Sequence, residues 1–274
     1  MNLTKNIEDF PKSINLNKKW FKSCKLRIPR IVIAGATSGV GKTSITCSII
    51  HSLQKHGFSV QPFKVGPDYI DPGYLSSISK HETYNLDVWL MGKNQLLNSF
   101  ISNSQSDVSV IEGVMGYYDG FGGDSNHAST HHVASLTKSP VLLVLDASKT
   151  SRSIAATALG FVKFHKNSCI SGIILNKIGS KKHEILCRTA LEKIKIPIIG
   201  VIPKNPLLDM PSRHLGLIST LENKTLKTQV QKVSKIISNY LDIGEIIKIA
   251  KNSSDLTKKP KPLIKKVKTT IAVA

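Results

Sequence analysis

Cysteine is scarce in this sequence: its 274 residues include four cysteines, and no two of them form a C-x-x-C pair. Four scattered thiols fit a reducing cytoplasm better than a disulfide framework. Long apolar runs are also missing, because none approaches the ~18 residues that a membrane helix needs. The amino terminus lacks the continuous apolar core of a secretory signal. We therefore expect a cytoplasmic protein without a membrane partner.

Acidic side chains are few: 18 Asp and Glu face 38 Lys and Arg, which gives a formal net charge of +20. The excess is greatest at the ends, since residues 1–30 and residues 244–274 each carry eight basic and two acidic side chains. Basic tails can bind nucleic acid or anionic lipid, but solvated lysine-rich extensions have the same composition. We favour solvated extensions and expect no nucleic-acid partner. The smaller basic excess between the tails suits a polyanionic substrate.

Short apolar runs bounded by turn residues alternate with helical patterns along the chain. Such runs are typical of parallel strands that are covered on both faces. We expect strands in "RIVIAGA", "FSVQPFKVG", "DVSVIEG", "SPVLLVLDAS", "CISGIILNKIG" and "IPIIGVIP", and helices at residues 42–56, 151–166, 181–195 and 223–250. This alternation predicts an α/β fold of the P-loop NTPase type, with a doubly wound, mainly parallel sheet and helices on both faces.

The stretch "GATSGVGKTS", residues 35–44, follows the first predicted strand. It matches the phosphate-binding pattern G-x-x-x-x-G-K-[ST] except that Ala36 stands in place of the first glycine. Its glycines let backbone N–H groups turn toward an anion, and Lys42 adds a positive charge. Thr43 stands where a hydroxyl reaches magnesium, at the start of a helix whose dipole favours phosphate. The stretch therefore predicts a nucleotide site.

Two polar turns also follow predicted strands: "KVGPDYIDPGY" and "EGVMGYYDGFGG", at residues 64–74 and 112–123. The first contains Lys64, Asp68 and Asp71, and its carboxylates can hold magnesium or face a substrate. The second has Glu112 at the end of its strand and Asp119 in a glycine-rich segment. An acid at such a strand end in a P-loop protein commonly binds the metal, directly or through water.

Three histidines and two large apolar residues have simpler interpretations. His127, His131 and His132 could pass for a metal cluster, but no acidic ligand stands beside them, so we expect no zinc site. Trp89 and Met91 are interpreted as core residues rather than as a stacking surface.

Five stretches occur together in one order and spacing: "SGVGKTS", "KVGPDYIDPGY", "NLDVWLM", "EGVMGYYDG" and "PSRHLGL". In these stretches the sequence resembles the cobyrinate a,c-diamide synthases. That family contains ATP-dependent, glutamine-using amidases of cobalamin biosynthesis with a dethiobiotin-synthetase-like amino-terminal domain. The resemblance implies a basic extension at 1–27, an ATP-binding amidoligase domain at 28–250 and the start of a truncated glutaminase domain at 269–274. Between the last two, residues 251–268 have the Lys- and Pro-rich composition of a linker.

The resemblance also implies the reaction. Such enzymes transfer the γ-phosphoryl group of ATP to a carboxylate of a corrin precursor, and ammonia then displaces phosphate to leave an amide. We expect ATP as co-substrate, Mg²⁺ as cofactor, a corrinoid polycarboxylate as substrate, and a glutaminase domain or subunit as the source of ammonia. The nucleophilic cysteine and partner histidine of the glutaminase half have no match here, so we expect that half to be missing.

The residues that match the family's motifs receive roles by the same resemblance. The catalytic set is Lys42, Lys64, Asp68, Glu112 and Asp119, of which Asp68 and Glu112 would hold magnesium with Thr43. The residues expected to bind ATP are Gly39, Val40, Gly41, Lys42, Thr43, Ser44 and, at the adenine, Asn176. The residues expected to bind substrate are Tyr69, Asp71, Tyr118, Arg213 and His214.

Two alternatives remain open. A nickel-sirohydrochlorin a,c-diamide synthase shares nearly the whole motif set, so the sequence does not distinguish a cobalt corrin from a nickel sirohydrochlorin. A partitioning-type P-loop ATPase could use basic tails on DNA or membrane. Proteins of that group carry a second lysine five positions before the loop lysine, and Thr37 occupies that position here.

Overall fold

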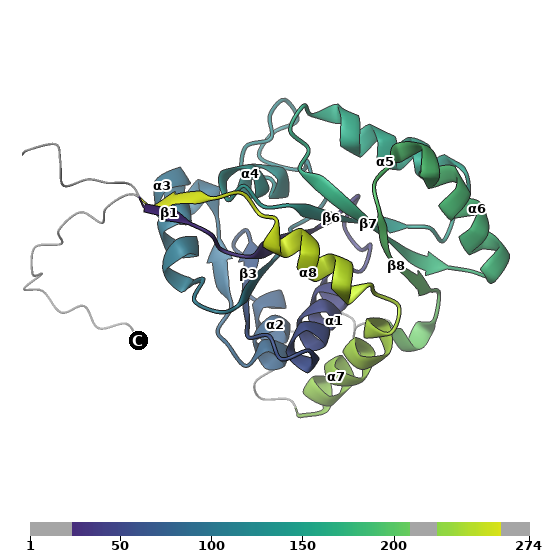
Figure 1. The fold of residues 1–274 in the computed structure, drawn as a ribbon, viewed down its shortest axis with the longest axis horizontal. Helices are drawn as coiled ribbons and strands as arrows, with labels where there is room; N and C mark the ends of the chain where they lie inside the picture. The colour runs from purple at the N-terminus through teal and green to yellow at the C-terminus, as the bar shows by residue number, and fades with distance from the viewer. Residues whose placement is uncertain (1–23, 209–223, 259–274) are drawn as a thin grey trace, which may run out of the picture.

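The computed structural model describes residues 24–208 and 224–258 (Figure 1). Its centre is a seven-stranded sheet with the order β4-β3-β5-β2-β6-β7-β8, in which every pairing is parallel. In chain order the strands are β2 (Arg30–Gly35), β3 (Val60–Val65), β4 (Tyr84–Leu86), β5 (Val108–Glu112), β6 (Val141–Asp146), β7 (Ile170–Ile178) and β8 (Ile198–Pro203). The apolar runs predicted all of these strands except the short edge strand β4.

Helices cover both faces of the sheet. One face carries α1 (Lys42–Lys55), α2 (Asp71–Ser79), α7 (Lys224–Ser238) and α8 (Ile243–Lys251). The other face carries α3 (Val88–Asn103), α4 (Thr130–Leu136), α5 (Ser153–Phe164) and α6 (Lys181–Leu191). Short 3₁₀ turns are η2 (Glu192–Ile194) and η3 (Pro206–Leu208). No helix in the described ranges is long and apolar enough to cross a membrane.

Side-chain alternation within each strand explains the two layers. In β2, Ile31 and Ile33 belong to the core beneath α1, whereas Val32 and Ala34 belong to the core on the opposite face. Successive side chains of a strand point to opposite faces, so a strand buried on both faces needs apolar residues at every position. The uninterrupted apolar runs therefore reflect burial of the strands on both faces, as the sequence indicated, and the doubly wound fold is confirmed.

The helical pattern expected at residues 223–250 forms two helices, α7 and α8, instead of one. The backbone N–H of Asp242 donates to Ile199 O at 2.7 Å, which ties the connecting turn to β8. The side chain of Asp242 then caps α8 by accepting from Glu245 N at 2.9 Å. The bond to β8 and the cap on α8 thus divide the segment into two helices, although its apolar periodicity continues through both.

A two-stranded antiparallel sheet joins the ends of the described chain, where β1 (Cys24–Leu26) pairs with β9 (Leu256–Lys258). Arg30 lies beside it, fully buried, and its guanidinium donates at 2.6 to 3.0 Å to the carbonyls of Ile28, Thr137, Lys138 and Ser254. Burial lowers the pKa of Arg30 to about 10 against the attraction of Asp255. The folded unit extends past both expected limits, residues 28 and 250, into the segment that composition alone indicated as linker.

Replacing Arg30 with alanine is expected to lower the free energy of unfolding by about 3 kcal/mol or more, because buried carbonyls would lose their donors. Urea denaturation followed by circular dichroism measures this change. Arg188→Ala is the matched control, since its guanidinium is exposed and pairs only with Glu184 among the described contacts. We expect the control to change stability by less than about 0.5 kcal/mol. Equal losses in the two variants would contradict a structural role for Arg30.

Candidate nucleotide and acceptor site

The order in which strands are added to the sheet reverses at β2. This strand lies between β5 and β6, and the chain crosses it on passing from β5 to β6. In doubly wound sheets such a reversal of strand order opens a crevice beyond the carboxyl ends of the strands, where ligands bind. The segment of residues 36–41, called the phosphate loop below, leaves β2 at this position and leads into α1 (Figure 1).

The conformation of the phosphate loop depends on its two glycines. Gly39 and Gly41 have φ angles of 76° and 93°, which side chains with a Cβ rarely adopt. A Cβ at Gly41 would also lie 2.5 Å from Asn176 Nδ2. Ala36, the departure from the usual pattern, has no positive φ, and its N–H continues the sheet by donating to Val144 O at 3.0 Å. This position therefore does not need glycine.

Lys42 is nearly buried, and its ammonium is held at the phosphate loop. Nζ lies 2.6 Å from Met115 O and 3.4 Å from Thr37 O, so the loop and the segment after β5 both contact it. The ammonium thus lies at the amino terminus of α1, whose dipole favours an anion.

Lys64, at the end of β3, is the centre of a buried ion cluster. Its Nζ lies 2.6 Å from Asp71 Oδ2, 2.8 Å from Glu112 Oε1 and 3.6 Å from Asp68 Oδ2. Thr43 Oγ1 donates to the same Glu112 Oε1 at 2.7 Å. The contact between Lys64 and Glu112 follows from strand register, because β3 and β5 pair these two residues. The cluster thus connects the phosphate loop to both acidic turns.

Charge and burial oppose each other in this cluster. Burial by itself lowers the pKa of Lys64, but the carboxylates of Glu112 and Asp71 outweigh it and raise that pKa above its ordinary value. Burial raises the pKa of Glu112, while Lys64 acts in the opposite direction. Lys64 is accordingly protonated at neutral pH, whereas burial, with the charge of Asp71, keeps the pKa of Glu112 above its ordinary value.

One oxygen of Glu112 has no partner. Oε2 is buried without a hydrogen bond, which is unfavourable unless a ligand satisfies it. Three carboxylates also face one lysine here, so a divalent cation would balance their excess negative charge. Mg²⁺ usually takes one or two carboxylates and completes its shell with phosphate and water. Oxygens of Thr43, Asp68 and Glu112 fit that description, because they supply two carboxylates and one hydroxyl. A site made by three or more His, Cys, Asp or Glu side chains alone is not found among the described residues.

Asp68 has a second task in its turn. Its Oδ1 accepts from the backbone N–H groups of Ile70 and Asp71, at 2.9 and 3.1 Å. Asn85 Nδ2 donates to the carbonyls of Asp68 and Gly66, at 2.7 and 2.8 Å. These bonds hold the turn before α2 in one shape. Oδ2 of Asp68 is left at the edge of the cluster, where a ligand can reach it.

The glycine-rich segment after β5 packs directly on the phosphate loop. Tyr117 N donates to Gly35 O at 2.8 Å, and a Cβ at Gly116 would lie 2.9 Å from Ala36 O. Asp119 is exposed, and its Oδ2 accepts from Gly116 N at 2.8 Å. Asp119 is therefore held next to the phosphate loop, outside the buried ion cluster.

Two predicted substrate contacts are placed differently from the expectation. Asp71 is 2% exposed, and its carboxylate faces Lys64 rather than an open site. Because α2 begins at Asp71, the helix start fixes this carboxylate under the lysine. Tyr118 turns toward α5, where its hydroxyl donates to Phe161 O at 2.7 Å and its ring stacks on the Phe161 ring. The described contacts of the two side chains are thus with Lys64 and with Phe161.

The remaining predicted residues vary in exposure. Tyr69 is 86% exposed next to the ion cluster and is available to a ligand. Val40 and Ser44 are buried. Arg213 and His214 lie outside the described residues.

On the other side of the phosphate loop, the ends of β6 and β7 contribute polar groups. Asn176 Nδ2 donates to Val40 O at 2.9 Å, so the predicted adenine-binding residue contacts the loop itself. The sequence reasoning missed an ion pair beside it, in which Lys177 Nζ lies 2.8 Å from Asp146 Oδ2. Asp146 ends an apolar run just as Glu112 does, so the same signal could have indicated it.

The histidines have neighbours of their own. His131 Nε2 lies 3.0 Å from Asn167 O, and His132 Nδ1 accepts from Ala128 N at 3.2 Å. Thr130, at the start of α4, accepts from Val114 N and donates to Val114 O through Oγ1. These contacts anchor the end of the glycine-rich segment.

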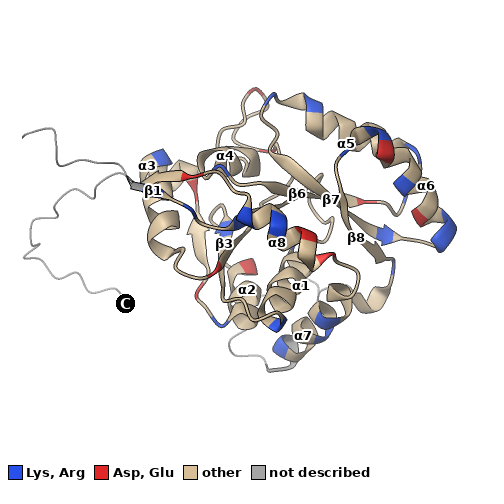
Figure 2. Cartoon of the chain, in the orientation of Figure 1, with Lys and Arg blue, Asp and Glu red and all other residues tan. Residues whose placement is uncertain are grey.

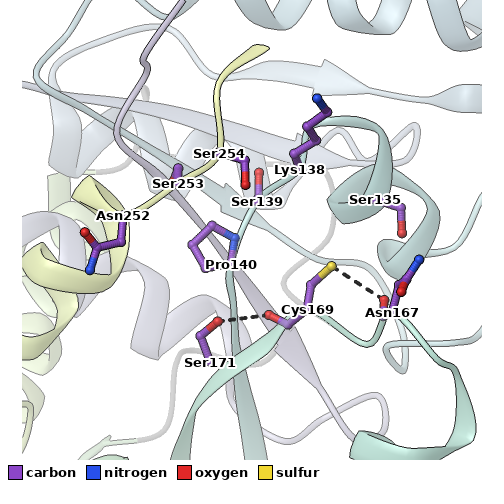
Figure 3. A pocket seen from close by; sticks show the side chains of 10 residues that line it. All are labelled: Ser135, Lys138, Ser139, Pro140, Asn167, Cys169, Ser171, Asn252, Ser253 and Ser254. Carbon is purple, nitrogen blue, oxygen red and sulfur yellow. Dashed lines mark hydrogen bonds between the residues drawn. The ribbon is translucent and has the colours of Figure 1, made fainter.

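A separate cavity of about 460 Å³ lies at the opposite ends of the strands from the phosphate loop (Figure 3). Its walls include Pro140 and Cys169, which precede β6 and β7, and Ser253, which follows α8. It therefore opens at the amino ends of these strands. This cavity does not belong to the site at the phosphate loop.

Residues 31–218 match the family model of the CobQ/CobB/MinD/ParA nucleotide binding domain. The chain belongs to this family. The matched range includes the phosphate loop and every residue of the buried ion cluster.

Curated relatives of this chain include a,c-diamide synthases. Cobyrinate a,c-diamide synthase of Listeria innocua is 41% identical over 231 residues, which cover 83% of this chain and 51% of that protein. Hydrogenobyrinate a,c-diamide synthase of Streptomyces coelicolor is 39% identical over 232 residues, covering 84% of this chain and 48% of that protein. The resemblance that the motifs indicated is confirmed, and the chain spans about half the length of these relatives.

Solved structures match less closely. Chloroplast FtsY from Physcomitrella patens superposes with a TM-score of 0.49 at 17% identity, covering 66% of this chain and 60% of that one. The family assignment therefore rests on the sequence matches.

Proposed function

We propose that this chain catalyses the ATP-dependent step in the amidation of the a and c carboxylates of cobyrinate, through an acyl-phosphate. The observation that carries the proposal is the buried cluster of Lys64, Glu112 and Thr43 at the phosphate loop, in a chain about 40% identical to a,c-diamide synthases. A nucleotide site needs a phosphate loop and a metal ligand. A protonated lysine beside both also suits an anionic acceptor.

The proposed reaction has two steps. An oxygen of the acceptor carboxylate attacks the γ-phosphorus of ATP, the bond to the β,γ-bridging oxygen breaks, and ADP leaves with that electron pair. Ammonia then adds to the carbonyl carbon of the acyl-phosphate and loses a proton, and inorganic phosphate leaves to give the amide. Both steps require oriented reactants and neutralised oxygen charge more than covalent help from the protein.

The side chains divide this work by position. Lys42 and the N–H groups at the start of α1 attract the β- and γ-phosphate oxygens. Magnesium, held by Thr43, Asp68 and Glu112, would neutralise phosphate charge when bound. Lys64 steadies the transferring phosphoryl group or the acceptor carboxylate. Asp119 lies outside the ion cluster and is assigned to positioning the corrinoid and ordering the two amidations.

Ammonia is proposed to come from glutamine through a glutaminase domain or subunit. Hydrolysis of glutamine needs a cysteine thiolate, and activated cysteines have lowered pKa values. Burial raises the pKa of all three cysteines whose side chains are described, Cys47, Cys169 and Cys187. None of these three has the environment of a glutaminase nucleophile.

We therefore expect the 274-residue chain to amidate cobyrinate with ATP and ammonium chloride, but not with ATP and glutamine. Mass spectrometry with isotopically labelled ammonium chloride detects each new amide, and omission of ATP is the control. Amide formation from glutamine by the pure chain would contradict the division of labour. No amide from either source would contradict the proposed activity of this chain, and a co-expressed glutaminase should restore the use of glutamine if the two parts dock.

Two other functions remain testable, the first of them in the same assay. Nickel sirohydrochlorin replaces cobyrinate to test the alternative ring system, since the same carboxylate chemistry applies. A partitioning-type ATPase would require binding of DNA or membrane by basic residues. In the view of Figure 2, Lys and Arg are distributed over α6, α7 and α8, with acidic residues among them on α6 and α8. Thr37, in place of the second lysine of that group, favours the amidase over this alternative.

A further inference from the structure

Trp89 is exposed, contrary to its interpretation as a core residue. It lies in the first turn of α3 with 57% of its surface accessible, whereas Met91 is half-buried. Asp87 caps this turn by accepting from Leu90 N at 3.0 Å, and Gly92 interrupts the helix with φ 70°. The turn is therefore set apart from the rest of α3, and it presents the indole outward.

The exposed indole has a second exposed aromatic ring against it. The ring centroids of Trp89 and Phe121 are 4.5 Å apart with an interplanar angle of 31°, and Phe121 is 63% exposed. The rings of His127 and Trp89 meet edge to face, with their centroids 6.0 Å apart. Two large aromatic side chains left in water together offer a broad apolar surface, which suits a flat apolar ligand face.

A tight loop holds Phe121 in this position. Phe121 N donates to His127 O at 2.7 Å, and Gly120 bridges to Gly122. A Cβ at Gly120 would lie 2.2 Å from His127 O, so only glycine permits this closure. The aromatic pair is therefore a preformed surface, because the loop that carries it is closed by its own backbone.

This surface lies beside the proposed reaction centre. Phe121 follows Asp119 by two residues, in the segment whose Gly116 packs on the phosphate loop. Trp89 follows β4, whose Leu86 O accepts from Gly66 N next to the end of β3. A ligand on the aromatic pair therefore extends toward Lys64 and Asp119.

The surface is on the opposite side of the phosphate loop from the expected adenine position. Asn176 ends β7, whereas Trp89 follows β4, and five strand spacings separate β4 from β7. At ~4.8 Å per spacing this separation is about 24 Å. The nucleotide base and a ligand on the aromatic pair would thus lie on opposite sides of the γ-phosphate, as donor and acceptor of a phosphoryl group must.

A basic residue follows Trp89 in the same segment of the chain. Lys93 is exposed one residue after the break at Gly92. It is close enough to His132 that its charge, after burial, lowers the pKa of that histidine. A flat ring face, with a cation at its border, suits a conjugated macrocycle that carries peripheral carboxylates.

We infer that Trp89 and Phe121 form the platform on which the face of the tetrapyrrole substrate lies, with Lys93 meeting a peripheral carboxylate. This inference rests on the proposed function and adds to it the residues that select a macrocycle. It differs from the roles of Asp119 and Tyr69, because the platform contacts the ring face rather than the reacting carboxylate.

The test is equilibrium dialysis of cobyrinate against the full chain, with the bound ligand quantified by its visible absorbance. Trp89→Ala and Phe121→Ala should each raise the Kd for cobyrinate by about tenfold or more, as expected for the loss of an aromatic stacking partner. Trp89→Phe should keep most of the affinity. The Kd for ATP should be unchanged in all three variants. Tyr240→Ala is the control, because Tyr240 is an exposed aromatic residue that follows α7, far from the platform.

A fluorescence experiment tests direct stacking. The chain has two tryptophans, so Trp20→Phe leaves Trp89 as the single indole. Cobyrinate should quench its emission with the Kd found by dialysis, after correction with a free tryptophan derivative for absorbed light. A protein that binds cobyrinate without quenching, or that binds it equally well as Trp89→Ala, would overturn the platform and leave the proposed function intact. A parent chain that binds neither cobyrinate nor sirohydrochlorin would overturn both.

Discussion

Lys42→Ala is expected to reduce ATP turnover by about a hundredfold or more while the protein remains folded. The ammonium is held at the phosphate loop by Met115 O and Thr37 O, so it acts as a charge directed at phosphate. Its removal leaves the core layers of β2 and α1 in place. Steady-state release of phosphate measures the effect, and circular dichroism confirms the fold.

The control for Lys42→Ala is Lys55→Ala. Lys55 is exposed in the last turn of the same helix, so the substitution removes equal charge from α1 at a distance from the phosphate loop. We expect unchanged turnover in this variant. Folded Lys42→Ala protein that retains full activity would refute the assignment of the loop.

Glu112→Gln is expected to raise the Mg²⁺ concentration needed for half-maximal turnover by roughly 10–100-fold and to lower the maximal rate. A neutral amide is a poor ligand for a hard cation, and the unpartnered Oε2 would be replaced by an amide group. Lys64 keeps Asp71 as an ion partner, which limits the loss of stability. Titration of activity with magnesium chloride, together with thermal unfolding, separates the two effects.

Asp119→Ala provides the contrast for Glu112→Gln. Asp119 is exposed and bonds only Gly116 N among the described contacts, so its removal should spare ATP affinity and the Mg²⁺ requirement. Amidation should still slow, and a monoamide should accumulate. If both variants lose ATP affinity equally, the separate roles of the two carboxylates are wrong.

The buried cluster makes the acceptor side of the site sensitive to single substitutions. Lys64 meets Asp71 seven residues away and Glu112 forty-eight residues away, within 2.8 Å of each. Removing either carboxylate leaves a buried lysine with fewer partners, and removing the lysine takes away the cation that the carboxylates share. Conservative substitutions such as Glu112→Gln are therefore more informative than truncation to alanine.

The site was predictable where local sequence carries the chemistry. The spacing of Gly39, Gly41, Lys42 and Thr43 specifies a turn and a helix start, so the nucleotide site could be placed without tertiary contacts. Glu112 at the end of an apolar run was found in the same way. The role of Asp71 was not, because its burial against Lys64 depends on the angle at which α2 leaves the turn after β3.

Sequence by itself determined the layered α/β fold, since strands buried on both faces are mainly apolar, and it determined the phosphate loop, since glycine readily adopts the positive φ angles at its end. Tertiary structure decided which distant groups meet. The register of β3 on β5 places Lys64 against Glu112, the pairing of β1 with β9 includes residues whose composition is that of a linker, and the break at Gly92 exposes Trp89. Periodicity reports how each segment is buried on average, whereas these contacts depend on strand order and on where a helix is interrupted.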